Sequence, residues 1–437
     1  MNPSSLAGHA IELLDRVVKS NLPSDRVVQD FYRERRYLGS HDRRWITERL
    51  YGIIRNFILL RDLCGKCGNA SSPLHIFLAY ELAIVATGTH ELNENYSQLL
   101  ESYKMSGEKL ELDVLAACLT ERLEAVKRNP SSVHLVYSFP DFFPELLPES
   151  VREEAVPIMV ALNREARVCI RVAANRIQRD EVARIFSEKG IETKPGEYSP
   201  MALYLPKRIN LNNEQLYRDG FIEIQEEASQ LIGLMLNPHK NEIIVDACAG
   251  AGGKSLEIAA LSAGESRIYA LDVDEGRLGN LDTRARRSGY TNISPLRISG
   301  SSLDDAASLI GAADKVVVDA PCSGSGTIRR NPDKKFRLTR SVVHERAGYQ
   351  ETLLKRYAGL VKVGGILLYS TCSIFSEENF GVIEAFLRSD GRFIQEDVSF
   401  YLTEPKFSKL FEAGCLAIYP HRHDMDGFFA AVMKRVS

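Results

Sequence analysis

Residues 314–327, DKVVVDAPCSGSGT, constrain the fold more than any other stretch of the chain. Their apolar run predicts a buried strand that ends at Asp319 and leads through Cys322 into a loop of serines and glycines. A short apolar run that ends in an acid is typical of a central strand in a parallel sheet. A second apolar run, residues 365–373, contains Cys372 near its end. We therefore predict that the two cysteines face one ligand.

Further strands alternate with helices through the C-terminal half. This alternation is typical of an α/β domain in which helices cover both faces of a parallel sheet. The strands are expected at residues 242–247, 267–273, 315–320, 365–373 and 428–434.

A glycine-rich loop, DACAGAGGKS at residues 246–255, follows the first of these strands and precedes a predicted helix. Glycines let the backbone approach a ligand closely, and a helix N-terminus favours electron-rich groups. Asp272 ends the next strand, where an acid commonly binds ribose hydroxyls. Together these features predict a nucleoside-bearing cofactor at the carboxyl ends of the strands.

Three cofactors are compatible with such a loop to different degrees. A phosphate-binding loop requires glycine where the chain has Cys248, which counts against this cofactor. The apolar strand that ends at Asp319 counts for it, because nucleotide hydrolases have a similar strand after the loop. A dinucleotide fingerprint fits Gly250 and Gly252 but meets Ser255 at its third glycine. S-adenosylmethionine needs the ribose acid and no phosphate cradle, so we favour it and keep a nucleotide hydrolase as an alternative.

The paired cysteines suit the methylation of cytosine at C5. This carbon is a poor nucleophile until a thiolate adds to C6, so the reaction needs an activated cysteine. A second cysteine can assist the release of the product, and Asp319 is placed to hydrogen-bond the base edge. The alternative is that Cys322 and Cys372 are inert core residues, because cysteine is among the most buried residue types. Their position after strands, between small polar residues, favours function.

These motifs resemble those of the RsmB/Nop2/Sun family of RNA cytosine-5 methyltransferases. DAPCSGSG is similar to motif IV of the family, YSTCSIFSEEN (residues 369–379) to motif VI, DACAGAGGKS to motif I, Asp272 to motif II and residues 426–429, DGFF, to the terminal motif. The resemblance implies an S-adenosylmethionine-dependent enzyme with a Rossmann-like domain built on a mostly parallel, seven-stranded sheet.

By this resemblance, Cys372 is the nucleophile, Cys322 assists product release, Asp319 orients the base and borders the cofactor, and Lys254 reaches the catalytic centre. The residues expected to bind the cofactor are Cys248, Ala249, Gly250, Ala251, Gly252, Gly253, Lys254, Asp272 and Asp319. The sequence departs from the family pattern at Ala251, where proline is usual. The motif III acid near the adenine is also missing around residues 300–301, and Asp304 is a candidate to replace it.

Upstream, residues 1–130 are expected to form an all-α domain. Their stretch DRRWITERLYGIIRN resembles part of the family's antitermination-factor-like domain. Residues 131–150 are expected to be a linker. Residues 151–230, which include ALNREARVCIRVAANR, resemble the family's small α+β, RRM-like module, and residues 231–437 form the catalytic domain. Eight arginines between residues 33 and 61 favour a polyanionic partner.

A basic run after the motif IV loop is expected to contact RNA phosphates. It comprises Arg329, Arg330, Lys334 and Lys335. The target is expected to be a loop or exposed strand of ribosomal RNA, because the base must be unstacked for this chemistry.

The bulk composition neither requires nor excludes nucleic acid, since the formal net charge of the 437 residues is −3. Eight scattered cysteines without disulfide spacing suit a reduced, cytoplasmic protein, and the absence of a long apolar run predicts no membrane segment. We also expect a monomer. Cys64 and Cys67 have the spacing of half a zinc site, but we expect ordinary cysteines and no metal. Two further alternatives are an RNA-binding ribosome-assembly factor with a degenerate cofactor site and a DNA cytosine methyltransferase, in which Cys372 would have no role.

Overall fold

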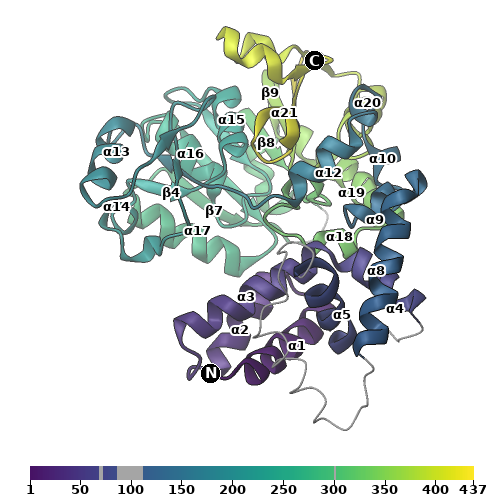
Figure 1. Ribbon diagram of the computed structural model, residues 1–437. Helices are drawn as coiled ribbons and strands as arrows, with labels where there is room; N and C mark the ends of the chain where they lie inside the picture. Colours follow the sequence, from purple (N-terminus) through teal and green to yellow (C-terminus); the bar gives the residue numbers. More distant parts are fainter. Residues whose placement is uncertain (68–71, 86–111, 300–301) are drawn as a thin grey trace. The chain divides into compact units, whose positions relative to one another are not determined.

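A computed structural model describes residues 1–67, 72–85, 112–299 and 302–437 (Figure 1). The chain forms two compact units, each assembled from several stretches. The first unit contains residues 1–145, 152–163 and 330–339, and the second contains residues 146–151, 164–329 and 340–437. No helix in these described ranges is both long enough and apolar enough to cross a membrane.

The first unit is helical, which confirms the predicted all-α fold. The first helix shows why a helix begins where it does. Pro3 occupies its first turn, and the Asn2 side chain caps it by accepting a hydrogen bond of 2.8 Å from the Ser5 N–H. Apolar residues at helical spacing then bury one face of each helix in a common core. The α-helices are α1 (Pro3–Lys19), α2 (Ser24–Glu34), α3 (Ser40–Arg55), α4 (Phe57–Lys66), α5 (Pro73–Ala79), α8 (Leu112–Arg128), α9 (Val133–Val136), α12 (Ala155–Asn163) and α18 (Lys334–Arg337), with the π-helix η1 (Tyr80–Val85) and the 3₁₀ helix η2 (Pro130–Ser132).

The expected linker contains η2, α9, α10 (Phe143–Leu146) and the start of α11 (Glu149–Arg152). Helix α12, which the sequence placed in the small module, belongs to the first unit.

Lys335 is buried in the first unit, where only 1% of it is exposed. Its ammonium donates to the carbonyl oxygen of Arg55 and, over 2.8 Å, to Oδ1 of Asn163. The neighbouring Phe336 ring lies 4.7 Å from that of Phe57. Burial lowers the pKa of Lys335 well below its usual value. The prediction that Lys335 contacts phosphate is therefore wrong, because this side chain is enclosed by its own unit.

The cysteines of the first unit also differ from the expectation of a fully reduced chain. Cys67 forms a disulfide bond with Cys118 of α8, with their Cα atoms 6.1 Å apart. Cys64 is buried in the helical core, and burial raises the pKa of its thiol to about 11. The CxxC pair is therefore not half of a zinc site.

The second unit begins with a small module whose elements follow the order β-α-β-β-α-β. They are β1 (Val168–Val172), α13 (Arg179–Glu188), β2 (Lys194–Pro195), β3 (Ala202–Leu205), η3 (Leu211–Asn213), α14 (Gln215–Arg218) and β4 (Ile222–Ile224). The described strands form an antiparallel sheet in the order β2-β3-β1-β4. Ile170 and Val172 of β1 pack into the module's own core, so the intervening Arg171 faces the opposite side.

The remainder of the unit is organised around a mixed sheet, of which nine strands lie in the described residues. Strands β7, β6, β5, β8 and β9 are parallel in this order, and β13 pairs with β9 in the antiparallel direction. This arrangement confirms the predicted Rossmann-like class. There are more strands than the seven expected because β10 and β12 pair with successive halves of β13, and β11 extends the edge beyond β12.

Helices cover both faces of this sheet (Figure 1). The strands are β5 (Ile243–Asp246), β6 (Arg267–Asp272), β7 (Ile293–Arg297), β8 (Ala313–Asp319), β9 (Val361–Thr371), β10 (Phe393–Glu396), β11 (Phe411–Glu412), β12 (Cys415–Ile418) and β13 (Phe428–Arg435). The helices are α15 (Glu227–Leu236), α16 (Gly253–Leu261), α17 (Glu275–Arg287), η4 (Asp304–Leu309), η5 (Ser325–Thr327), α19 (Arg340–Ala358), α20 (Phe380–Ser389), η6 (Val398–Phe400), η7 (Pro405–Leu410) and α21 (Pro420–His423).

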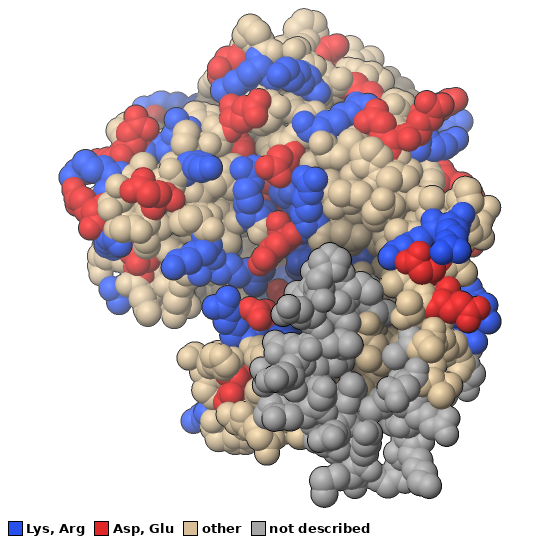
Figure 2. Space-filling view, in the orientation of Figure 1, with Lys and Arg blue, Asp and Glu red and all other residues tan. Residues whose placement is uncertain are grey.

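Because the central strands are parallel, the loops after β5, β6, β8 and β9 emerge at one edge of the sheet. These loops contain the residues selected from the sequence. On the face shown in Figure 2, acidic and basic side chains alternate over the second unit instead of forming a field of one sign.

Candidate active site

Two cysteine sulfur atoms meet at this edge of the sheet. Strands β8 and β9 are neighbours, with Asp319 opposite Ser370, so the loops that follow them start side by side. The Sγ atoms of Cys322 and Cys372 lie 3.3 Å apart, and both residues are partly buried. The proximity predicted from the sequence is therefore present, and the roles of the two thiols remain to be tested.

A buried carboxylate, Glu378, holds the two cysteine-bearing loops together. It accepts hydrogen bonds from the N–H and the hydroxyl of Ser323, at 2.7 and 2.5 Å, and from the hydroxyl of Ser373, at 2.6 Å. Each serine directly follows one of the cysteines. Gln350 of α19 donates a further hydrogen bond of 3.1 Å to Glu378. Glu378 was not among the residues predicted from the sequence; the four hydrogen bonds that its carboxylate accepts explain why an acid stands at this position of motif VI.

Two glycines allow a third loop to pack against the pair. The Gly326 N–H donates to the Cys372 carbonyl oxygen over 3.0 Å, and the Gly427 N–H donates to the Gly326 carbonyl oxygen over 2.9 Å. A Cβ atom on Gly326 would lie only 2.2 Å from the Gly427 carbonyl oxygen. The DGFF motif thus supports the backbone of Cys372 through a contact that only glycine permits.

Lys254 and Asp319 form an ion pair next to this loop cluster. The Lys254 Nζ donates to Asp319 Oδ2 over 3.1 Å and to the hydroxyl of Ser229 over 2.5 Å, while Asp319 Oδ1 accepts 2.9 Å from Ser370. Burial opposes the charge on Lys254, but the carboxylates of Asp319, Glu257 and Asp246 together outweigh burial and raise the lysine pKa. Asp319 is therefore fixed from both sides, with part of its side chain still exposed.

The glycine loop has the geometry of a close backbone approach. Gly250 and Gly252 have φ angles of +53° and +86°, and a Cβ on Gly252 would lie 2.6 Å from Leu281. The Gly250 N–H donates to Asp272 Oδ2 over 2.8 Å, so the loop and the acid at the end of β6 are adjacent. Beside Asp272, Val273 is an exposed apolar side chain. An acid, an open glycine turn and an exposed apolar side chain fit an adenosine group.

Three other acids lie near the ends of these strands. Burial raises the pKa of Asp246 to about 6, although the Ser255 hydroxyl donates to it over 2.6 Å. The predicted motif III gap, residues 300–301, lies outside the described residues. Asp304 accepts a bond of 2.7 Å from Ser302, whereas Asp305 accepts two from Ser299. Neither contact assigns Asp304 to the cofactor.

Arg329 does not reach the surface expected for a phosphate contact. It is 3% exposed, and its Nε donates to Asp426 Oδ1 over 2.6 Å. The prediction is wrong for this residue because its charge is neutralised inside the second unit by the acid of the DGFF motif. Arg330 and Lys334 are partly buried, and their contact with RNA remains a prediction.

Glu378→Gln is expected to lower kcat by about 10- to 100-fold, because the neutral amide cannot accept from both serines and the sulfur atoms would shift relative to the substrate. Methyl transfer to RNA and the melting temperature should be measured together. Glu377→Gln is the matched control, since in the described part of the chain that neighbouring side chain pairs with the exposed His344 and with neither serine. Unchanged turnover of the folded Glu378→Gln protein would show that Glu378 does not position the two cysteine-bearing loops for catalysis.

The fold and site together define a class of Rossmann-like methyltransferase. The family model "16S rRNA methyltransferase RsmB/F" matches residues 233–434, and a model for the RsmF/B ferredoxin-like domain matches residues 139–212. The chain belongs to the RsmB/F methyltransferase family.

Individual relatives agree with this assignment. The chain is 29% identical over 417 residues to "Probable ribosomal RNA small subunit methyltransferase B" of Synechocystis, covering 91% of this chain and 92% of the relative. It is 29% identical to the mouse "28S rRNA (cytosine-C(5))-methyltransferase" over 72% of this chain and 41% of that protein. The crystal structure of PH0851 superposes with a TM-score of 0.78 at 26% identity and covers 100% of this chain and 99% of that one.

Proposed function

We propose that the protein methylates C5 of a cytosine in small-subunit ribosomal RNA, with S-adenosylmethionine as the methyl donor. The single observation that carries this proposal is the 3.3 Å approach of two thiols next to the Lys254–Asp319 pair. Two cysteines at separate edges of the sheet could not both act on one base, whereas this spacing lets one add to the base and the other assist its release. The names of the Synechocystis and mouse relatives support the RNA and the C5 position.

In this mechanism Cys372 adds to C6 of the base as a thiolate, which makes C5 nucleophilic. Asp319 orients the base edge, since Ser370 and Lys254 hold its carboxylate in place. After methyl transfer the Cys322 side chain, as its thiolate, takes the C5 proton, the C5–C6 double bond re-forms and the Cys372 thiolate is eliminated. Cys322, 3.3 Å away, assists this elimination.

S-adenosylmethionine would supply an electrophilic methyl group. Asp272 is the proposed ribose ligand, and the loop of residues 248–254 would line the methionine and ribose portions. Lys254 has both Ser229 and Asp319 as partners, so its role is to fix Asp319 at the boundary between cofactor and base. The Arg330 and Lys334 side chains remain proposed phosphate contacts. We also propose that the protein acts as a monomer in the cytoplasm.

Bisulfite sequencing of ribosomal RNA from cells with and without the protein tests this function. We expect one or a few small-subunit cytosines to lose their protection from conversion when the protein is absent, and to regain it when the wild-type chain is restored. Restoration with a Cys372→Ala chain should not protect them. Complete protection without the protein, combined with a defect in subunit assembly, would instead favour the assembly-factor alternative.

A further inference from the structure

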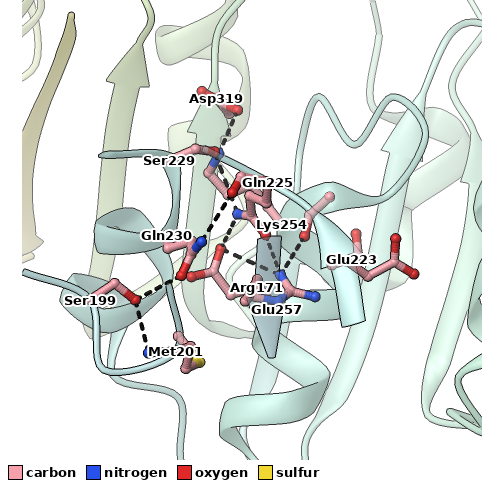
Figure 3. A network of polar contacts seen from close by, with 12 residues as sticks. Arg171, Ser199, Met201, Glu223, Gln225, Ser229, Gln230, Lys254, Glu257 and Asp319 are labelled. Carbon is pink, nitrogen blue, oxygen red and sulfur yellow. Dashed lines mark hydrogen bonds and ion pairs between the residues drawn. The ribbon is translucent and has the colours of Figure 1, made fainter. Parts of the chain in front are cut away.

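Arg171 of the small module is buried against the glycine loop. Only 2% of this residue is exposed, and its Nη1 donates to the Gly253 carbonyl oxygen over 3.1 Å and to Gln225 Oε1 over 2.5 Å. Figure 3 shows the arginine pointing from β1 into this network. Burying a guanidinium is costly unless it is paired and hydrogen-bonded, so its position requires a specific set of partners.

The main partner is Glu257 of α16, which is fully buried. Arg171 Nη1 lies 3.8 Å from Oε2 of this carboxylate, and Gln225 Nε2 donates to the same oxygen over 2.6 Å. One oxygen of Glu257 has no hydrogen-bond partner among the described residues. Burial raises the pKa of Glu257 to about 7, and the nearby Arg171 counteracts this shift. Arg171, with a smaller contribution from Lys254, thus stabilises this carboxylate.

A second residue of the module holds the other end of the loop. Glu223 of β4 lies opposite Arg171 in the sheet register and pairs with Arg284 over 2.9 Å. Arg284 in turn donates to the Ala251 carbonyl oxygen. Residues from two adjacent strands of the module therefore act on Ala251 and Gly253, which flank the left-handed Gly252.

The same network continues to the candidate catalytic pair. Gln225 donates to the hydroxyl of Ser229 over 3.4 Å, and Ser229 accepts from Lys254, which donates to Asp319 (Figure 3). The path runs from the small module to the boundary between cofactor and base without leaving the second unit.

We infer that Arg171 is a positioning residue for the cofactor loop, so that the small module is a structural part of the S-adenosylmethionine site as well as a candidate RNA-binding element. This inference rests on the proposed cofactor. It requires that loss of Arg171 weakens cofactor binding even when the buried charges remain balanced.

The test compares Arg171→Met, Arg171→Met/Glu257→Gln and Arg176→Met with the wild-type full chain. S-adenosylhomocysteine is the probe, and its Kd is measured by calorimetry beside the melting temperature and the KM values for S-adenosylmethionine and RNA. Arg176 is the matched control, because it also joins the module to the larger sheet domain, through the carbonyl oxygen of Ser288 after α17. Its other hydrogen bond, to the carbonyl oxygen of Asp219, stays inside the module, and it contacts no residue of the loop in the described structure.

We expect Arg171→Met to lower the melting temperature, because it leaves Glu257 buried without its cation. The double variant should recover most of this stability and still bind the probe about tenfold or more weakly, with a raised KM for the cofactor and an unchanged KM for RNA. Arg176→Met should bind the probe like wild type.

Wild-type affinity in the folded double variant would overturn the inference while leaving the proposed function in place. Equal weakening by Arg176→Met would also overturn it, since any loss of module docking would then explain the effect. Failure of the wild-type chain to bind the probe would instead count against the proposed cofactor, and the inference would fall with it.

Discussion

Replacing Cys372 with alanine is expected to abolish methylation, with activity below about one-thousandth of wild type, while the fold is retained. The loss follows because no other group at this position can form the C6 bond. The fold should survive because the backbone of this residue is held independently, through its carbonyl oxygen and the Gly326 N–H, and its side chain is only partly buried. Transfer of labelled methyl groups to unmodified small-subunit RNA, measured beside circular dichroism, checks both statements.

Cys415→Ala is the matched control for this experiment. Cys415 is a buried cysteine of β12, where burial raises the pKa of its thiol to about 12, so it has the properties of an inert core residue. Its replacement should reduce stability slightly and leave turnover near wild type. Full activity of the Cys372→Ala protein would assign the nucleophile to a different group.

Cys322→Ala should produce the opposite phenotype, in which the reaction starts but does not finish. The Cys372 adduct can still form and accept the methyl group, but the step that releases the enzyme loses the thiol 3.3 Å away. We expect a protein–RNA species that survives denaturing electrophoresis and a turnover lower than wild type by about 100-fold or more.

The Cys322→Ala/Cys372→Ala double variant supplies the control, because it lacks the atom that forms the bond. It should give no shifted species under the same conditions. A shifted band from this double variant would locate the covalent link elsewhere. Rapid turnover of Cys322→Ala without any trapped species would reduce Cys322 to a packing role.

The sequence predicted those parts of the site that are encoded by short stretches of neighbouring residues. Short apolar runs ending in Asp319 and Cys372 identify β8 and β9, because buried parallel strands need continuous apolar residues. Parallel neighbours then bring their carboxyl ends together, which accounts for the two sulfur atoms. The glycines at 250 and 252 likewise indicate positive φ angles through their residue type alone.

The polar residues that support the site could not be predicted in this way. Arg329 and Lys335 belong to one basic run, yet both are buried and bind groups that are distant in sequence. Arg329 pairs with Asp426, and Lys335 donates a hydrogen bond to Asn163. Arg171 lies in an otherwise apolar strand with no local sign of its partner Glu257. Burial of a charge depends on tertiary pairing, which periodicity does not report.

The first unit includes residues 330–339, which the ribosome adds more than 160 residues after the rest of that unit. During synthesis, the helices of residues 1–163 must therefore wait for most of the second unit's central strands before the Lys335 and Phe336 side chains fill their places. A fragment that stops near residue 163 would leave Asn163 without its hydrogen bond to Lys335 and Phe57 without its ring contact to Phe336. The roles of the two units should consequently be tested by point substitutions. Cutting the chain between them would remove residues 330–339 from the first unit and leave them as an unpacked segment of the second.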